Sequence, residues 1–139
     1  MNQFTGAWAA HQLADFIETV WACPDEPAAC AAAVERAAEA FEAEVAAIVS
    51  GNAVRALVGM ADTARHRTDV TALTTGAAET LDVPGVGICA VAAQDHQDAV
   101  HLLVARRQSD PFTAEERGLL RSMTRVLALT LDNFRLLNT

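Results

Sequence analysis

The chain has 139 residues and is 52% hydrophobic and 20% charged, so it can bury a core and is not a disordered or low-complexity protein. Its ten arginines (there is no lysine) and eighteen acidic residues give a net charge of −8, which disfavours nucleic acid and anionic membrane surfaces as partners. It has no apolar run of about 18 residues and no basic segment before an apolar stretch, which disfavours a membrane span and a secretory signal. We therefore expect one cytoplasmic domain over residues 1–139.

The first 42 residues predict two helices. Apolar residues recur at helical spacing over about 8–22, which predicts a helix with one apolar face. The stripe on this face consists of Leu13, Phe16, Ile17, Val20 and Trp21. Two prolines in residues 23–27 break the helix, and an alanine-rich stretch predicts a second helix over about 28–42.

Residues 43–106 predict strands and a pocket segment. Two short apolar runs are separated only by Gly51-Asn52, which is typical of a β-hairpin. The pattern of apolar residues is weak from Gly59 onward, although an edge strand is expected just before the turn at Pro84-Gly85. Two further strands, joined by a polar loop, follow this turn. The five expected strands cover about 45–50, 53–58, 78–83, 87–93 and 99–106.

A long helix is expected at the end of the chain, over 113–137. Thr113 followed three residues later by Glu116 forms a capping box, which marks the start of a helix. The apolar seam of this helix consists of Leu120, Met123, Leu127, Leu131 and Phe134. The helix looks unfinished at Leu137-Asn138-Thr139, as would be expected in a piece of a longer protein.

The order of these elements resembles that of a GAF domain. Ala33–Phe41 running into Ala43–Val49 looks like the second helix and first strand of that family. Leu103–Arg107 followed by Pro111–Leu120 looks like its last strand and final helix, and the segment Pro111–Glu116, PFTAEE, is the most specific part. The alanine- and arginine-rich composition resembles actinobacterial members. The resemblance covers nearly the whole chain except residues 60–80.

The resemblance implies an α+β fold with a PAS-like, antiparallel central sheet of about five strands and helices on both sides. The long N- and C-terminal helices would share one face, and a ligand pocket would lie on the other. It implies a sensing or dimerising module that often precedes a diguanylate cyclase, a phosphodiesterase or a histidine kinase. The sequence lacks the N-K-F-D-E-type signature of cyclic-nucleotide binding and has no cysteine in residues 60–86 for a bilin, so the cofactor is unknown.

Candidate ligand-binding residues lie in and beside the segment where GAF domains place the pocket lid. Two arginines that flank a histidine could grip an anion, the histidine could ligate haem or a metal, and hydroxyls could line a cavity. These candidates are Arg65, His66, Arg67, Thr71, Thr74, Thr75 and, near the expected pocket floor, Cys89. The competing interpretation is a solvated polar loop, because loops collect such residues.

The cysteines and histidines give little support for catalysis. Cys23, Cys30 and Cys89 have no metal-site spacing, and buried small apolar residues are the simpler interpretation. One GAF subfamily, the free methionine-(R)-sulfoxide reductases, uses neighbouring cysteines, but here only Cys89 would lie near the pocket. His11, His96 and His101 show no ligand spacing either. We therefore expect neither an enzyme nor a metal site.

The two outer helices carry more apolar surface than one sheet face can cover. A symmetric homodimer in which these helices pack as a parallel bundle is the usual solution, although packing of both helices on each other and on the sheet would also explain the surface. The predicted interface comprises Leu13, Phe16, Ile17, Val20, Leu120, Met123, Leu127, Leu131 and Phe134. The sequence thus predicts a non-catalytic regulatory module that dimerises and could bind a small molecule, and the alternative is a ligand-free dimerisation scaffold.

Overall fold

The computed structural model describes residues 3–50, 53–59, 80–83, 87–94, 100–106 and 111–137, with the backbone alone for 3–6, 80–83 and 87–94. Two helices come first, α1 (Gln3–Trp21) and α2 (Glu26–Ala40). Five strands follow, β1 (Val45–Ser50), β2 (Ala53–Val58), β3 (Thr80–Val83), β4 (Gly87–Gln94) and β5 (Val100–Arg106). The last element is α4 (Ala114–Leu137), so the predicted order of helices and strands is confirmed.

The strands form one antiparallel sheet with the order β2-β1-β5-β4-β3. The predicted edge strand is confirmed as β3, which among the described strands pairs with β4 alone. The β1–β2 pairing shifts its register between Ile48 and Val49, which face Ala56 and Val54, so Arg55 is an extra residue in β2. This bulge reverses the alternation of side chains along β2.

The helix ends follow local chemistry and correct three of the predicted bounds. α2 begins at Glu26 and not at 28, because Asp25 caps it by accepting a hydrogen bond from the Ala28 amide (2.9 Å) and because a proline is compatible with a first turn. It ends at Ala40, since Glu42 turns the chain with a positive φ of 51°. α1 begins five residues earlier than predicted, at Gln3.

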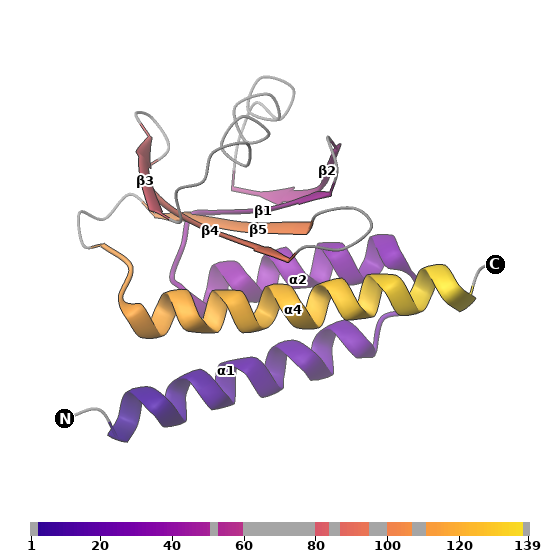
Figure 1. Cartoon of the computed structure of the whole chain (residues 1–139), viewed down its shortest axis with the longest axis horizontal. Coiled ribbons are helices and arrows are strands. Elements are labelled where there is room, and N and C mark those ends of the chain that lie inside the picture. The colour runs from indigo at the N-terminus through magenta and orange to yellow at the C-terminus, as the bar shows by residue number, and fades with distance from the viewer. Residues whose placement is uncertain are drawn as a thin grey trace.

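The molecule has three layers (Figure 1). α2 and α4 lie side by side against one face of the sheet, and α1 packs on these two helices from outside. The main core lies between the helices and this face, where Ile48, Leu102 and Val104 of the sheet meet Met123 and Leu127 of α4. All three described helices are on the same side of the sheet. The prediction of helices on both sides is still a prediction, because residues 60–79 lie outside the described residues.

Candidate functional site

Most of the predicted ligand-binding residues lie outside the described residues. Arg65, His66, Arg67, Thr71, Thr74 and Thr75 belong to residues 60–79 and are therefore still predictions. Cys89 lies in β4, where its backbone is opposite Leu81 of β3 and Ala105 of β5. The described part of the expected pocket is therefore the sheet itself.

The sheet face away from the helices has a small apolar floor. Side chains alternate along β1 and β5, so residues next to those of the main core point the other way. Ala47, Val49 and Leu103 form a separate buried cluster on this second face, each with no exposed surface. Val54 and Leu57 of β2 pack against its margin. A hydrophobic surface is therefore buried on the face that the described helices do not cover.

His101 brings a polar atom to this face. It lies two residues before Leu103 in β5, with its backbone opposite Val49 of β1, and its side chain is partly buried. Its Nδ1 atom is buried without a hydrogen-bond partner among the described residues. Burial lowers the pKa of His101 from its ordinary value of 6.5, because desolvation disfavours the charged form. Near neutral pH the ring is therefore neutral and can accept or donate one hydrogen bond.

The two described cysteine side chains belong to the helical layers. Cys30 of α2 is buried, and desolvation raises the pKa of its thiol to about 11, with a further contribution from Glu26. A thiol with a raised pKa is a poor nucleophile, because the thiolate is the reactive form. Cys23, just after α1, is partly buried, and its Sγ donates to the carbonyl oxygen of Thr19 (3.3 Å). These observations fit the prediction of small buried residues at both positions.

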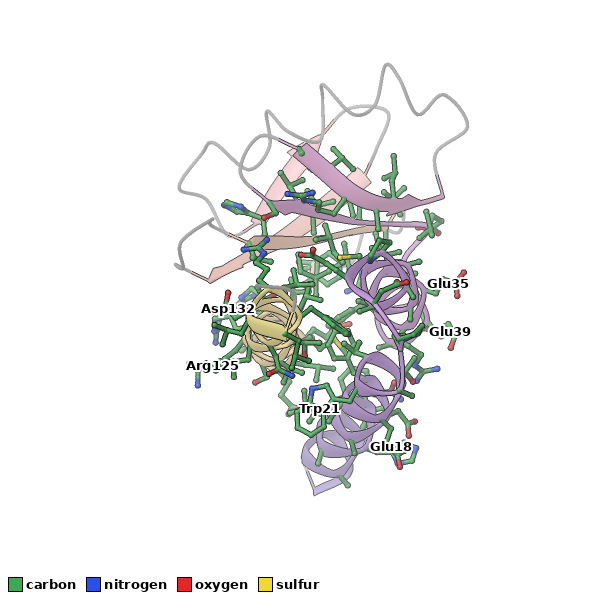
Figure 2. All side chains as sticks on the ribbon, turned by 90° about the vertical axis from the view of Figure 1, so that its right-hand side faces the viewer. Glu18, Trp21, Glu35, Glu39, Arg125 and Asp132 are labelled. Carbon is green, nitrogen blue, oxygen red and sulfur yellow. The ribbon has the colours of Figure 1, made fainter. Side chains whose placement is uncertain are left out.

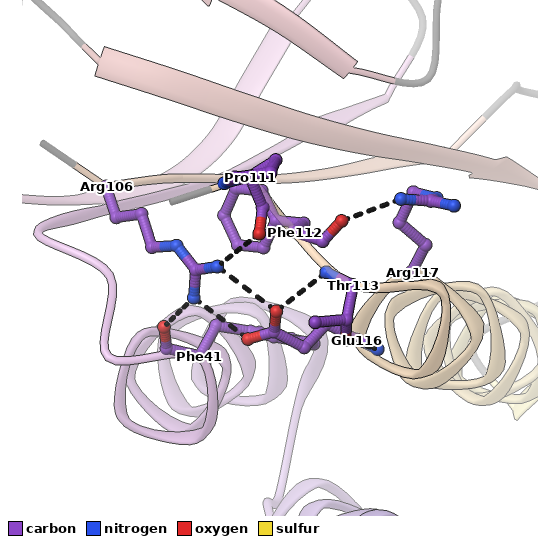
Figure 3. Close-up of polar contacts among 7 residues, drawn as sticks. All are labelled: Phe41, Arg106, Pro111, Phe112, Thr113, Glu116 and Arg117. Carbon is purple, nitrogen blue, oxygen red and sulfur yellow. Dashed lines mark hydrogen bonds and ion pairs between the residues drawn. The ribbon is translucent and has the colours of Figure 1, made fainter. Parts of the chain in front are cut away.

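A buried ion pair joins the end of β5 to the start of α4 (Figure 3). The Arg106 guanidinium donates to both carboxylate oxygens of Glu116, at 2.9 and 3.1 Å, and both side chains are largely buried. It also donates to the carbonyl oxygens of Phe41 (3.3 Å) and Pro111 (3.0 Å). The guanidinium carbon lies 4.1 Å from the centre of the Phe112 ring, a cation–π geometry. One arginine thereby connects the ends of α2 and β5 to the start of α4.

Glu116 also completes the predicted capping box. Its amide donates to Thr113 Oγ1 (3.1 Å), and its carboxylate accepts from the Thr113 amide (2.9 Å). The sequence motif identified this cap but not the partner of the carboxylate, because Arg106 lies outside the motif and lacks any local pattern. An arginine at the end of an apolar strand, followed by a second arginine, was the one available signal.

The predicted interface residues are mostly enclosed within the chain. Six of them have almost no exposed surface and belong to the main core: Phe16, Val20, Leu120, Met123, Leu127 and Leu131. Leu13 and Phe134 pack against this core, and Ile17 is partly buried. The physical reason is that α1 turns its apolar face toward α2 and α4, while α4 turns its own toward α1 and the sheet. These six side chains therefore have no surface to offer to a partner, while dimerisation itself is still a prediction.

The apolar surface that is exposed gathers on the last half of α4 and at the end of α1. In the described part of the chain, the large exposed hydrophobic residues are Trp21, Leu129, Leu136 and Leu137. A groove of about 610 Å³ lies between these helix ends, lined by Trp21, Cys23, Leu129, Thr130, Asn133, Phe134 and Leu137. Trp21 is held at its edge by a hydrogen bond from Nε1 to Thr130 Oγ1 (3.0 Å), and Figure 2 shows this end of the molecule.

Two features are absent from the described residues. None of the described helices is long and apolar enough to cross a membrane. In the same residues, histidine, cysteine and acidic side chains do not gather in groups of three that could hold a metal ion.

Comparison with models of known families and with curated proteins finds no match. Among solved structures, the chain is similar to the GAF domain of a protein assigned as a sensor histidine kinase from Pseudomonas syringae pv. tomato. The two are 20% identical, with 99% of this chain and 94% of that chain covered and a TM-score of 0.73. At this identity the likeness concerns the fold. The chain has an α+β fold of GAF type, with an antiparallel sheet and flanking helices, as predicted.

Proposed function

We propose that this GAF-type chain is a non-catalytic sensory or regulatory module of a bacterial signal-transduction protein. It works in the cytoplasm, dimerises through its terminal helices and takes a small molecule on the sheet face away from the helices. The observation that carries the proposal is the uneven covering of the sheet. All described helices pack on one face, while the other has a buried apolar cluster beside the Nδ1 atom of His101, which has no hydrogen-bond partner among the described residues.

The chemistry of this face suggests the class of ligand. Val54 and Leu57, which are partly buried at the margin of the buried cluster, offer only apolar contact, so most of the bound molecule would be apolar. The neutral ring of His101 would supply one oriented hydrogen bond. Small-molecule sites usually combine a mostly apolar lining with a few such polar groups. Arg65 and Arg67 would add contacts to an anionic group if the segment 60–79 carries the pocket lid, as the family resemblance predicts.

Transmission of the signal would use α4. Ligand binding would shift the segment 60–83 and thereby the final helix, which in a longer protein would continue into an effector domain. The Arg106–Glu116 pair supports this route, because it fixes the first turn of α4 to the ends of β5 and α2. α4 also packs on the sheet, on α1 and on α2, so a movement of this helix would affect every layer.

Two alternatives are kept. A GAF fold without a ligand could serve as a dimerisation scaffold, in which case the face around His101 would be filled by the chain's own side chains. A methionine-sulfoxide reductase is disfavoured, since Cys30 is buried in the helical layer and its thiol pKa is raised. The reductase alternative would be supported if the chain showed thiol-dependent reduction and Cys89→Ser abolished it.

Native mass spectrometry of the purified chain tests the proposal, with His101→Leu as the variant and His11→Leu, at an exposed position of α1, as the matched control. We expect a dimer with an additional bound mass that is lost in His101→Leu and kept in His11→Leu. A bare dimer for the unaltered chain would favour the scaffold. A bare monomer would contradict dimerisation, and a bound mass kept in His101→Leu would contradict the site.

A further inference from the structure

The exposed apolar side chains of the described residues gather around one groove. Four large hydrophobic residues are exposed in this part of the chain, and three of them line the groove between the end of α1 and the last turns of α4: Trp21, Leu129 and Leu137. The groove has a volume of about 610 Å³, which is within the range of small-molecule sites. Apolar surface that is concentrated in one hollow is typical of a contact site.

One wall of the groove is an exposed indole that is held in place. Trp21 is 66% exposed, yet its Nε1 donates a hydrogen bond to Thr130 Oγ1 (3.0 Å), which joins the end of α1 to α4 (Figure 2). The Thr130 hydroxyl in turn donates to the carbonyl oxygen of Val126 (2.8 Å), so its orientation is fixed as well. A ring that is already held in one orientation loses little freedom when a ligand binds to it.

Phe134 provides a second aromatic ring in the same groove. It lines the groove and is partly buried against the main core. The ring pair among the described residues is Phe41 and Phe112, so Trp21 and Phe134 do not stack on each other. Aromatic rings attract one another in offset or edge-to-face contact, and these two rings therefore have surface to offer to a third. A planar aromatic molecule suits this arrangement.

The lining of the groove excludes charged ligands. All seven lining residues are of uncharged types. The last turn of α1 has no basic residue, so the negative end of the helix dipole at Trp21 also disfavours an anion. Arg135 of α4 is not part of the lining and pairs with Glu26 of α2 (3.4 Å). A charged group in the groove would lose hydration without gaining an opposite charge, so the groove suits an uncharged molecule.

Asn133 is the polar residue of the lining whose side chain is still available. Trp21 and Thr130 bond to each other, and Cys23 Sγ donates to the carbonyl oxygen of Thr19 (3.3 Å). The carboxamide of Asn133 makes no hydrogen bond with the described part of the chain. It presents a donor and an acceptor side by side, so its best complement is a group with an adjacent acceptor and donor, such as a lactam.

We propose that the groove between α1 and α4 binds an uncharged, planar aromatic molecule that carries a lactam-type pair of hydrogen-bonding groups. The ring would contact Trp21 and Phe134, Leu129 and Leu137 would cover its edges, and the lactam would bond to Asn133. The groove belongs to the helical layers, whereas the site proposed above is on the opposite face of the sheet. The inference therefore does not rest on the proposed function. A bound molecule would hold the ends of α1 and α4 together.

Proton–nitrogen correlation NMR of the full chain, titrated with carbostyril, tests the proposal. Carbostyril is an uncharged, planar bicyclic lactam. We expect it to shift the indole N–H signal of Trp21 and the carboxamide signals of Asn133, with a dissociation constant of about 1 mM or below, as is usual for a molecule of this size. The chain has two tryptophans, and Trp21→Ala assigns the indole signal by removing it.

Two adjacent leucines give a matched control. Leu136 and Leu137 are both 73% exposed on α4, but of these two Leu137 alone lines the groove. We expect Leu137→Ser to weaken carbostyril binding about fivefold through lost apolar contact, and Leu136→Ser to change it by less than about twofold. Trp21→Ala should weaken it at least about tenfold, because the main aromatic contact is lost. Circular dichroism of each variant would verify that it is folded.

Two analogues of carbostyril test the class of ligand. N-methylcarbostyril lacks the lactam donor and should bind about tenfold more weakly to the unaltered chain. Asn133→Leu should remove this difference between the two compounds, since it removes the partner of the lactam. Quinaldate has a bicyclic ring of the same size with a carboxylate, and it should bind at least about tenfold more weakly than carbostyril.

Several outcomes would overturn the inference. If the signals of Trp21 and Asn133 do not move, the groove is not a site for this class of molecule. Shifts confined to β1 and β5 would place carbostyril on the sheet face, which would support the proposed function and contradict this site. Equal losses for Leu136→Ser and Leu137→Ser, or equal binding of quinaldate, would contradict the location or the uncharged class. A dissociation constant that rises with protein concentration would show that a second copy of the chain covers the groove instead.

Discussion

At the scale of single residues, the Arg106–Glu116 pair is a charged pair that the fold largely buries. Two charged groups are removed from water where three elements meet, and their mutual hydrogen bonds and two backbone carbonyl oxygens compensate for the lost hydration. Such a pair adds little net stability by itself, but removing either partner is strongly destabilising, because the other charge is left buried and unpaired. Its role is therefore to hold the start of α4 in one position.

Replacing Glu116 by Ala should lower the free energy of unfolding by about 3–4 kcal/mol, because it leaves the buried Arg106 charge unpaired and removes part of a helix cap. Urea unfolding measures the loss. Glu39→Ala removes a carboxylate that pairs with Arg36 on the surface of α2 and should cost less than about 1 kcal/mol. A similar small cost for Glu116→Ala would mean that the pair is not desolvated in solution.

His101 should make stability depend on pH. Burial lowers the pKa of the folded ring below its ordinary value of 6.5, so the unfolded chain takes up the proton at higher pH than the folded chain. The contribution of the neutral His101 ring to the free energy of unfolding is therefore fully present above pH 6.5 and is lost as the pH falls below that value. We expect His101→Gln to lose less stability between pH 7.5 and pH 5.5 than the unaltered chain does. His11→Gln, changed at an exposed position, should behave as the unaltered chain, and equal losses in all three would refute the role of His101.

At the scale of elements, α4 combines three tasks in one helix. Its first turn is fixed by Thr113, Glu116 and Arg106, its inner side fills the core, and its outer side exposes Leu129 and Leu136. Apolar residues therefore occur on more of its circumference than a helix that covers only one sheet needs. The inner residues of α4 form the core, and the exposed leucines of its outer side are not needed for that core.

Two glycines in different elements should respond oppositely to alanine. Gly118 lies inside α4 with ordinary contact distances around an added Cβ, so Gly118→Ala should stabilise the fold by about 0.5–1 kcal/mol through helix propensity. Gly59, just after β2, has a φ of +90°, and an added Cβ would lie 1.6 Å from the Glu44 carbonyl oxygen. Gly59→Ala should therefore destabilise by about 2 kcal/mol or more. Thermal unfolding of both variants at equal concentration measures this contrast, and a loss on Gly118→Ala would contradict the described packing of α4.

At the scale of the whole molecule, the layers predict where the fold opens last. β1 and β5 are hydrogen-bonded on both sides within the sheet, and most of their side chains are fully buried. β2 is an edge strand, and α1 is an outer layer that packs on α2 and α4.

Native-state hydrogen exchange should therefore be slowest in β1 and β5, approaching the free energy of global unfolding, and faster in β2 and in the first turns of α1. Exchange followed by mass spectrometry of peptides resolves these segments. If β2 were protected as strongly as β1 in a dilute monomer, the edge position of β2 would be contradicted.

The sequence alone determined what depends on short-range chemistry. Short apolar runs bounded by turn residues defined β1, β2, β4 and β5 nearly to the residue, and Thr113 with Glu116 located the start of α4, because both signals act within a few neighbours. Residues 60–79 had no clear pattern, and the candidate ligands in that segment are still predictions. The antiparallel sheet with flanking helices and the GAF-type fold were predicted from a resemblance and then confirmed, whereas the order of the strands in the sheet came from the structure alone.

Only the tertiary structure decided what each apolar face and each charge meets. Periodicity shows that Phe16, Met123 and Leu127 must be buried, but not whether the chain itself or a partner covers them, and here the chain does. The partner of Arg106 lies ten residues away in another element, so no local spacing announces it. The exposure of Leu129 and Leu136 also follows from the packing of α1 and the sheet on the opposite side of α4. Burial is a property of the assembled layers, and a sequence pattern specifies only which residues share a side.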